Sequence, residues 1–233
     1  MARVFTRNMF IMLLAIMVGT IIIIYFVGDI VYKSNIETLN EEHRVEITTL
    51  KGKNENFTSY FLKSSGVLDQ AREDRAFGNY HFDLAFLWYQ TALLERDGEL
   101  MEIYKFRGIV NCSDAMPYYT YSYQNFLQAK DFFEETKSYT NYDKYISLLD
   151  LYVNLTNTGS KLTMLRYNAS NYLMQLTENM TFNFDTGNVT FLENMSGLFM
   201  LFNETMFAYG GFLEEYDDYQ DIIDEYEFFD EQR

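Results

Sequence analysis

The sequence is short of cysteine, proline and basic residues, and each shortage excludes a class of structure or partner. A single cysteine among 233 residues excludes an internal disulfide framework and any metal site built on clustered thiolates. A single proline, where a chain of this length ordinarily has about 12, favours long helices over a β-sandwich or a disordered chain. The 18 Lys and Arg against 34 Asp and Glu give a net charge of −16, which argues against nucleic-acid binding.

Motifs of familiar catalytic sites are also missing from the sequence. The two histidines, His43 and His81, lie in no H-E-x-x-H motif and near no G-x-S-x-G turn, and the chain has no Gly-rich phosphate loop. We therefore expect no enzymatic activity, no cofactor and no metal site. Cys112 falls in residues 96–116, where helical periodicity lapses, so we predict a free or intermolecularly paired thiol in a loop.

One long apolar run lies near the N-terminus, and residues 9–28 carry no charged side chain. Its 19-residue core, MFIMLLAIMVGTIIIIYFV, would extend about 30 Å as a helix, close to the thickness of the bilayer hydrocarbon. A cleaved signal peptide is the main alternative. Its apolar region is usually only about 7–15 residues long and ends in small residues, so we favour an uncleaved signal anchor that contacts the bilayer through residues 9–28.

The charges before this run predict its orientation. Arg3 and Arg7 lie in the flanking residues 1–8 without an acidic neighbour. The positive-inside rule then places the N-terminus in the cytoplasm and the bulk of the chain outside it, at the cell membrane or an endomembrane.

Acceptor triplets for N-linked glycans are more frequent than chance predicts. Eight N-x-S/T triplets occur where about two are expected at random, and all follow the apolar run. They support an extracytoplasmic, glycosylated surface. The predicted glycan sites are Asn56, Asn111, Asn154, Asn168, Asn179, Asn188, Asn194 and Asn203.

Residues 29–65 are predicted to form one long helix. Ile36, His43, Leu50 and Phe57 recur every seven residues, which is typical of a helical stalk that pairs with a second helix or packs on its own ectodomain. The sequence leaves these two arrangements open.

Residues 66–211 are predicted to form a helical ectodomain. We expect one helix to begin at Pro117, a break at Thr158 and Gly159, a turn or small hairpin over residues 179–188, and a helix end at Gly210 and Gly211. The predicted fold is therefore all-α: a single N-terminal transmembrane helix continuing into an extracytoplasmic helical bundle or short helical array.

Residues 212–233 are acidic, but aromatic and aliphatic residues recur among them every three or four positions, which predicts an amphipathic helix. Its acidic face is a candidate contact for a basic partner or a weakly bound Ca²⁺ or Mg²⁺, although it lacks the EF-hand spacing. A dense tyrosine cluster is the second candidate contact site. The candidate contact residues are Asp217, Asp221, Asp224 and Glu225 on the acidic face, and Tyr118, Tyr119, Tyr121 and Tyr123 in the cluster.

These observations favour a membrane-anchored glycoprotein that acts through protein–protein interaction, with a protein partner or a second copy of itself, as an accessory or structural subunit of a membrane or cell-surface assembly. The alternative is a sensory or ligand-binding module. A membrane helix that continues into a helical bundle resembles the periplasmic four-helix domains of chemoreceptors, and signalling would then require a partner.

Overall fold

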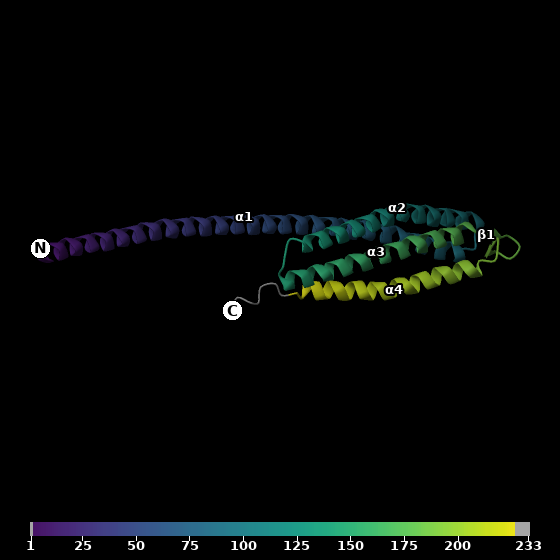
Figure 1. The fold of residues 1–233 in the computed structure, drawn as a ribbon. Coiled ribbons are helices and arrows are strands. Elements are labelled where there is room, and N and C mark those ends of the chain that lie inside the picture. Colours follow the sequence, from purple (N-terminus) through teal and green to yellow (C-terminus); the bar gives the residue numbers. More distant parts are fainter. Residues whose placement is uncertain (1, 227–233) are drawn as a thin grey trace. The chain divides into compact units, whose positions relative to one another are not determined.

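The computed structural model describes the backbone of residues 2–226 and the side chains of residues 25–226. The described chain is helical apart from one hairpin, which confirms the all-α prediction (Figure 1). It divides after Lys53 into two compact units, and each is described by itself. The elements are α1 (Ala2–Leu94), α2 (Gly98–Lys137), α3 (Asp143–Glu178), β1 (Met180–Asn183), β2 (Asn188–Phe191) and α4 (Ser196–Asp224).

The first unit is the part of α1 that ends at Lys53. Every residue from 25 to 53 is exposed except Gly52, which is half-buried. Among residues with described side chains, no helix combines the length and apolarity needed to cross a membrane. The predicted span at residues 9–28 lies outside those residues, except for its last four positions.

The second unit is an antiparallel four-helix bundle formed by α1 from Asn54 onward and by α2, α3 and α4. Polar contacts identify the neighbours around the bundle: Ser122 on α2 donates to the carbonyl of Ala71 on α1 (2.8 Å), and Thr158 on α3 donates to Glu215 on α4 (3.2 Å). Short connections join α1 to α2 and α2 to α3, as expected for antiparallel neighbours, and the β1–β2 hairpin joins α3 to α4. The expectation of a bundle or an array therefore resolves to a bundle.

The core repeats every seven residues and alternates small with large side chains. Along α1 the buried small positions are followed by large ones at a spacing of three or four residues, and α2 repeats the pattern. Small residues allow two helices to approach closely, and the large ones fill the space between them. The small positions are Ser64, Ala71, Gly78, Ala85 and Ala92 on α1 and Gly108, Ala115, Ser122, Ala129 and Thr136 on α2, whereas the large ones include Leu68, Phe82 and Tyr89 on α1 and Tyr119, Phe126 and Phe133 on α2.

Two glycines show how close this packing is. The Tyr119 ring lies directly on Gly78, where an added Cβ would come within 2.7 Å of ring atom Cε1. The Phe126 ring lies on Gly159 in the same way, at 2.5 Å from such a Cβ. Side chains larger than hydrogen at these two positions would push the rings, and with them the helices, apart.

Three of the predicted helix boundaries are wrong because the glycine or proline read as a breaker lies inside a helix. Asp97 caps α2 through its Oδ1, which accepts from the backbone of Glu99 and Leu100, so α2 begins at Gly98 and contains Pro117. Helix α3 runs through Thr158 and Gly159 because Gly159 accommodates a ring from α2, and α4 runs through Gly210 and Gly211. Tertiary packing outweighs the roughly 1 kcal/mol helix penalty of a glycine.

The turn or small hairpin predicted over residues 179–188 is a hairpin, and it extends to Phe191. Strands β1 and β2 pair antiparallel, with Met180 opposite Phe191 and Asn183 opposite Asn188. Gly187 closes the turn in the left-handed region, with a φ of 61°, and donates to the Asn183 carbonyl (2.9 Å).

Helix α4 docks on the bundle through arginine–aromatic contacts. Arg75 on α1 lies over the Tyr216 ring at 4.3 Å, and Arg166 on α3 lies over the Tyr209 ring at 4.1 Å. One buried nitrogen of each arginine has no hydrogen-bond partner among the described residues, so the aromatic faces supply the electrostatic compensation. Arg72 adds a hydrogen bond to the Tyr216 hydroxyl (3.0 Å).

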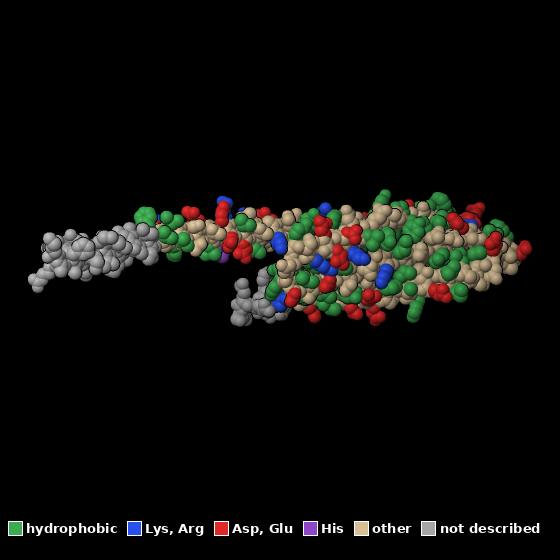
Figure 2. Space-filling view, in the orientation of Figure 1, with side chains coloured by type: hydrophobic (Ala, Val, Ile, Leu, Met, Phe, Trp, Pro, Cys, Tyr) green, Lys and Arg blue, Asp and Glu red, His purple; other side chains and the backbone are tan. Residues whose placement is uncertain are grey.

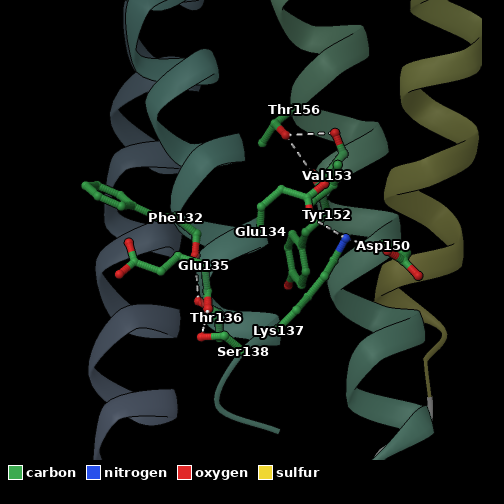
Figure 3. A network of polar contacts seen from close by, with 10 residues as sticks. All are labelled: Phe132, Glu134, Glu135, Thr136, Lys137, Ser138, Asp150, Tyr152, Val153 and Thr156. Carbon is green, nitrogen blue, oxygen red and sulfur yellow. Dashed lines mark hydrogen bonds and ion pairs between the residues drawn. The ribbon is translucent and has the colours of Figure 1, made fainter. Parts of the chain in front are cut away.

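An ion-pair network holds the end of α2 on the start of α3. Figure 3 shows Lys137 extending between Glu134 and Asp150, with its Nζ 2.8 Å and 2.6 Å from their carboxylates. Burial by itself lowers the pKa of Lys137, but the hydrogen bonds to Asp150 and Glu134 outweigh it and the pKa lies above its usual value. The lysine therefore stays charged and the helix ends stay paired.

Candidate interaction surface on helices α1 and α2

The predicted tyrosine cluster is divided between the surface and the core. Tyr121 is exposed, Tyr118 and Tyr123 are half-buried, and Tyr119 is fully buried. The expectation of an exposed contact is therefore wrong for Tyr119, whose hydroxyl donates to Asn79 Oδ1 (3.0 Å). Burial raises the pKa of this hydroxyl far above its usual value. Successive residues of a helix point about 100° apart, so neighbouring tyrosines cannot share one face.

The outward-facing tyrosines belong to an aromatic groove that α1 completes. We define the aromatic groove as Phe77, Tyr80, His81, Tyr118 and Tyr121. The Tyr118 ring lies 5.6 Å from both the Phe77 ring and the His81 ring, stacked on the latter at an interplanar angle of 10°. The His81 ring also meets Tyr80 edge to face at 5.4 Å. Such pairs rigidify one another and keep the rings in place at the surface.

The groove consists of two adjoining hollows of about 530 and 440 Å³, which share His81 and Tyr118. Glu73 lines the first and Asp114 lines the second, and neither lining includes Lys or Arg. Phe77, Tyr80 and Tyr121 are 47, 61 and 57% exposed. An open, acidic-edged aromatic surface of this kind can bind by stacking and by tyrosine hydrogen bonds.

Sequence reasoning missed the α1 half of this groove. Phe77, Tyr80 and His81 lie in residues 66–211, which the sequence predicted only as part of the helical ectodomain. The signal was available in the seven-residue pattern: Gly78 and Phe82 occupy core positions, so the aromatic residues between them must point outward.

None of the eight predicted glycan sites is buried. Five of the asparagines are exposed, and Asn111, Asn168 and Asn179 are half-buried. Asn111 borders the aromatic groove, because its Oδ1 lies 3.3 Å from His81 Nδ1 while its Nδ2 donates to the Arg107 carbonyl (2.9 Å). The exposed sites are Asn56, Asn154, Asn188, Asn194 and Asn203.

The predicted acidic face lies on the solvent side at the end of α4. Asp217, Asp221, Asp224 and Glu225 are all exposed, and acidic side chains are spread over the face of the bundle that Figure 2 presents. Within residues 25–226, no three His, Cys, Asp or Glu side chains are arranged to hold a metal ion. The predicted helix extends beyond α4 into residues 227–233, which lie outside the described residues.

Cys112 is a core residue of α2, which corrects the expectation of a loop thiol. It is fully buried in the seven-residue series that also contains Tyr119. Burial raises its pKa to about 12, with a further contribution from the negative charge of Glu178. The thiolate, which is the reactive form, is therefore disfavoured in the folded protein.

Cys112 should resist thiol reagents in the folded protein. At pH 8 the side chain is both inaccessible and protonated, so an aromatic disulfide reagent should label it only after denaturation with guanidinium. The Ser113→Cys variant, which puts a thiol at the exposed next position, is the matched control and should react in the native state. Rapid labelling of native wild-type protein would contradict the buried placement.

Comparison with known proteins gives no relative for this chain. No family model, no curated protein and no solved structure matches it.

Proposed function

We propose that this protein is a single-pass, membrane-anchored and N-glycosylated extracytoplasmic helical protein. It binds a partner protein through the aromatic groove, as an accessory or structural subunit of a membrane or cell-surface assembly, and is not an enzyme. The single observation that carries the proposal is the groove itself, a cluster of ordered aromatic rings that face solvent.

The composition of the groove supports protein binding. Aromatic side chains with a polar atom provide large contact areas at low entropic cost and dominate the binding energy of many protein interfaces. The acidic residues Glu73 and Asp114 at the groove favour a partner whose contact surface is basic at its rim. The proposed partner therefore inserts apolar or aromatic groups between Phe77, Tyr118 and Tyr121 and places Lys or Arg near the two carboxylates.

The anchor and its orientation are supported by the sequence. The apolar residues 9–28 follow Arg3 and Arg7, and every glycan acceptor triplet follows the apolar run. The acceptor asparagines occur on all four helices, on β2 and in the connections on either side of the hairpin, at positions open to solvent or partly so. A glycan at any of the five exposed asparagines would leave the core unchanged.

Removing two exposed rings should weaken partner binding without unfolding the bundle. In a double variant Tyr80→Ser, Tyr121→Ser, we expect the partner retained in mild-detergent extracts of the native membrane to bind more than tenfold more weakly, since hot-spot residues contribute about 2 kcal/mol or more. The control is Phe207→Ser, which removes a ring that is 87% exposed on α4, outside the groove.

Equal loss of the partner in both variants, or a strictly monomeric wild-type protein in native extracts, would contradict the proposed groove function. A wild-type protein without a protein partner that gains thermal stability from a small ligand, and loses this gain in the double variant, would instead establish the sensory alternative.

The anchor and the glycans can be tested together by translation of the full chain in the presence of microsomes. We expect a membrane-integrated product that resists alkaline extraction and whose mass falls on treatment with an N-glycosidase. The Asn203→Gln variant should lose a single increment of that mass shift, and Asn157→Gln, an asparagine outside any acceptor triplet, should lose none. An unglycosylated product that alkaline extraction releases from the membrane would overturn this part of the proposal.

A further inference from the structure

A second apolar surface lies on the first unit, the part of α1 that ends at Lys53. Within residues 36–50, apolar residues recur with an eleven-residue spacing, Ile36 with Ile47 and Leu39 with Leu50, and His43 lies between the two pairs. We call these five residues the 36–50 stripe. At about 3.6 residues per turn the intervals of three and four residues put all five on one face of α1.

Within the described residues of the first unit, nothing covers the 36–50 stripe. Ile36, Leu39, Ile47 and Leu50 are 39 to 65% exposed, and hydrophobic side chains are visible along the described part of this segment in Figure 2. Val45, on the opposite face, is exposed to a similar extent at 61%. A helix gains most of its stability from burying one apolar face, so a sustained stripe of this kind needs a partner helix.

The stripe continues the seven-residue series that forms the core of the bundle. Ile36, His43 and Leu50 are followed at the same spacing by Phe57, Ser64 and Ala71. In the bundle this series is covered by other helices of the same chain, since Ala71 is fully buried and Phe57 stacks on Tyr145 of α3 at 5.2 Å. The pattern of a helix–helix interface therefore begins before residue 54, where the bundle starts.

We propose that the 36–50 stripe pairs with the same stripe of a second copy of this chain, in parallel and in register. In a parallel pair, the residue just before an apolar core position on one helix faces the residue five positions later on the other helix. Glu46 precedes Ile47, and Lys51, which follows Leu50, lies five positions after Glu46. Glu46 of each copy therefore faces Lys51 of the other. In an antiparallel pair, each flanking position instead faces the same kind of flanking position on the other helix, and the Glu46–Lys51 pairing is lost.

His43 is the polar member of the stripe and favours one register. In register, the two His43 side chains lie opposite each other, and any shift of one helix along the other would bury an imidazole against Leu39 or Ile47 instead. A single polar residue in an apolar seam specifies register at some cost in stability. The pairing is independent of the aromatic groove and of the partner proposed for it.

Cysteine cross-linking of the full chain in mild detergent tests the parallel register. We expect Ile36→Cys and Leu50→Cys, made singly, each to give a disulfide-linked dimer on mild oxidation, because parallel pairing sets each position opposite itself at a Cα separation of about 4.4–6.8 Å. Val45→Cys is the matched control, exposed like Leu50 but on the opposite face, and should remain monomeric. The native Cys112 is buried and contributes no cross-link.

Failure of both stripe variants to cross-link would overturn the proposal, as would cross-linking of Val45→Cys at the same rate. An antiparallel pair centred on His43 would leave positions 36 and 50 far from their own copies. It would therefore also give no cross-link in either variant, and so would contradict the proposed parallel pair. As a second measurement, Ile47→Asp should raise the dimer dissociation constant at least tenfold in sedimentation, whereas Val45→Asp should leave it unchanged. Both substitutions lie outside the bundle, whose thermal unfolding should not change.

Discussion

The close approach of aromatic rings to glycines is the constraint on which the bundle and its surface depend. Tyr119 rests on Gly78 and Phe126 rests on Gly159, with no room for a methyl group at either glycine. This contact also positions the groove, because Phe77 precedes Gly78 and Tyr118 precedes Tyr119. Once Tyr119 lies on Gly78, the adjacent Phe77 and Tyr118 rings meet on the outside, 5.6 Å apart. The buried contact and the exposed one are therefore consequences of the same register between α1 and α2.

Much of the architecture could be predicted from the sequence, because seven-residue and three-to-four-residue periodicity identifies helices and the turn residues near Gly187 identify the hairpin. The positions of the breaks could not. Gly108 and Gly159 read locally as interruptions, yet they are buried packing positions whose role depends on side chains from other helices. Pro117 likewise lies inside a helix whose Asp97 cap is 20 positions earlier. The local sequence around a small residue does not show which side chain from another helix will pack against it.

The candidate site was predicted only in part, for the same reason. Tyr118 and Tyr121 were found from their density in the sequence, but His81 and Phe77 join them only after α1 and α2 are paired. Charged groups also divide between the core and the surface: arginines on α1 and α3 hold the aromatic face of α4, whereas Asp217, Asp221 and Asp224 on α4 face solvent. Arg75 and Arg166 thus act inside the bundle, where they hold α4, whereas the aromatic groove presents rings and acidic groups to solvent.

A double-mutant cycle at Gly159 and Phe126 tests the central packing constraint most directly. The account predicts that Gly159→Ala lowers the free energy of unfolding by about 1–3 kcal/mol, and that adding Phe126→Leu recovers part of this loss, with a coupling energy of about 1 kcal/mol or more. Gly66→Ala, at a helical position with open space around its Cβ, is the control and should stabilise by about 0.5–1 kcal/mol. If Gly159→Ala stabilises as Gly66→Ala does, and its effect adds independently to that of Phe126→Leu, the constraint is contradicted.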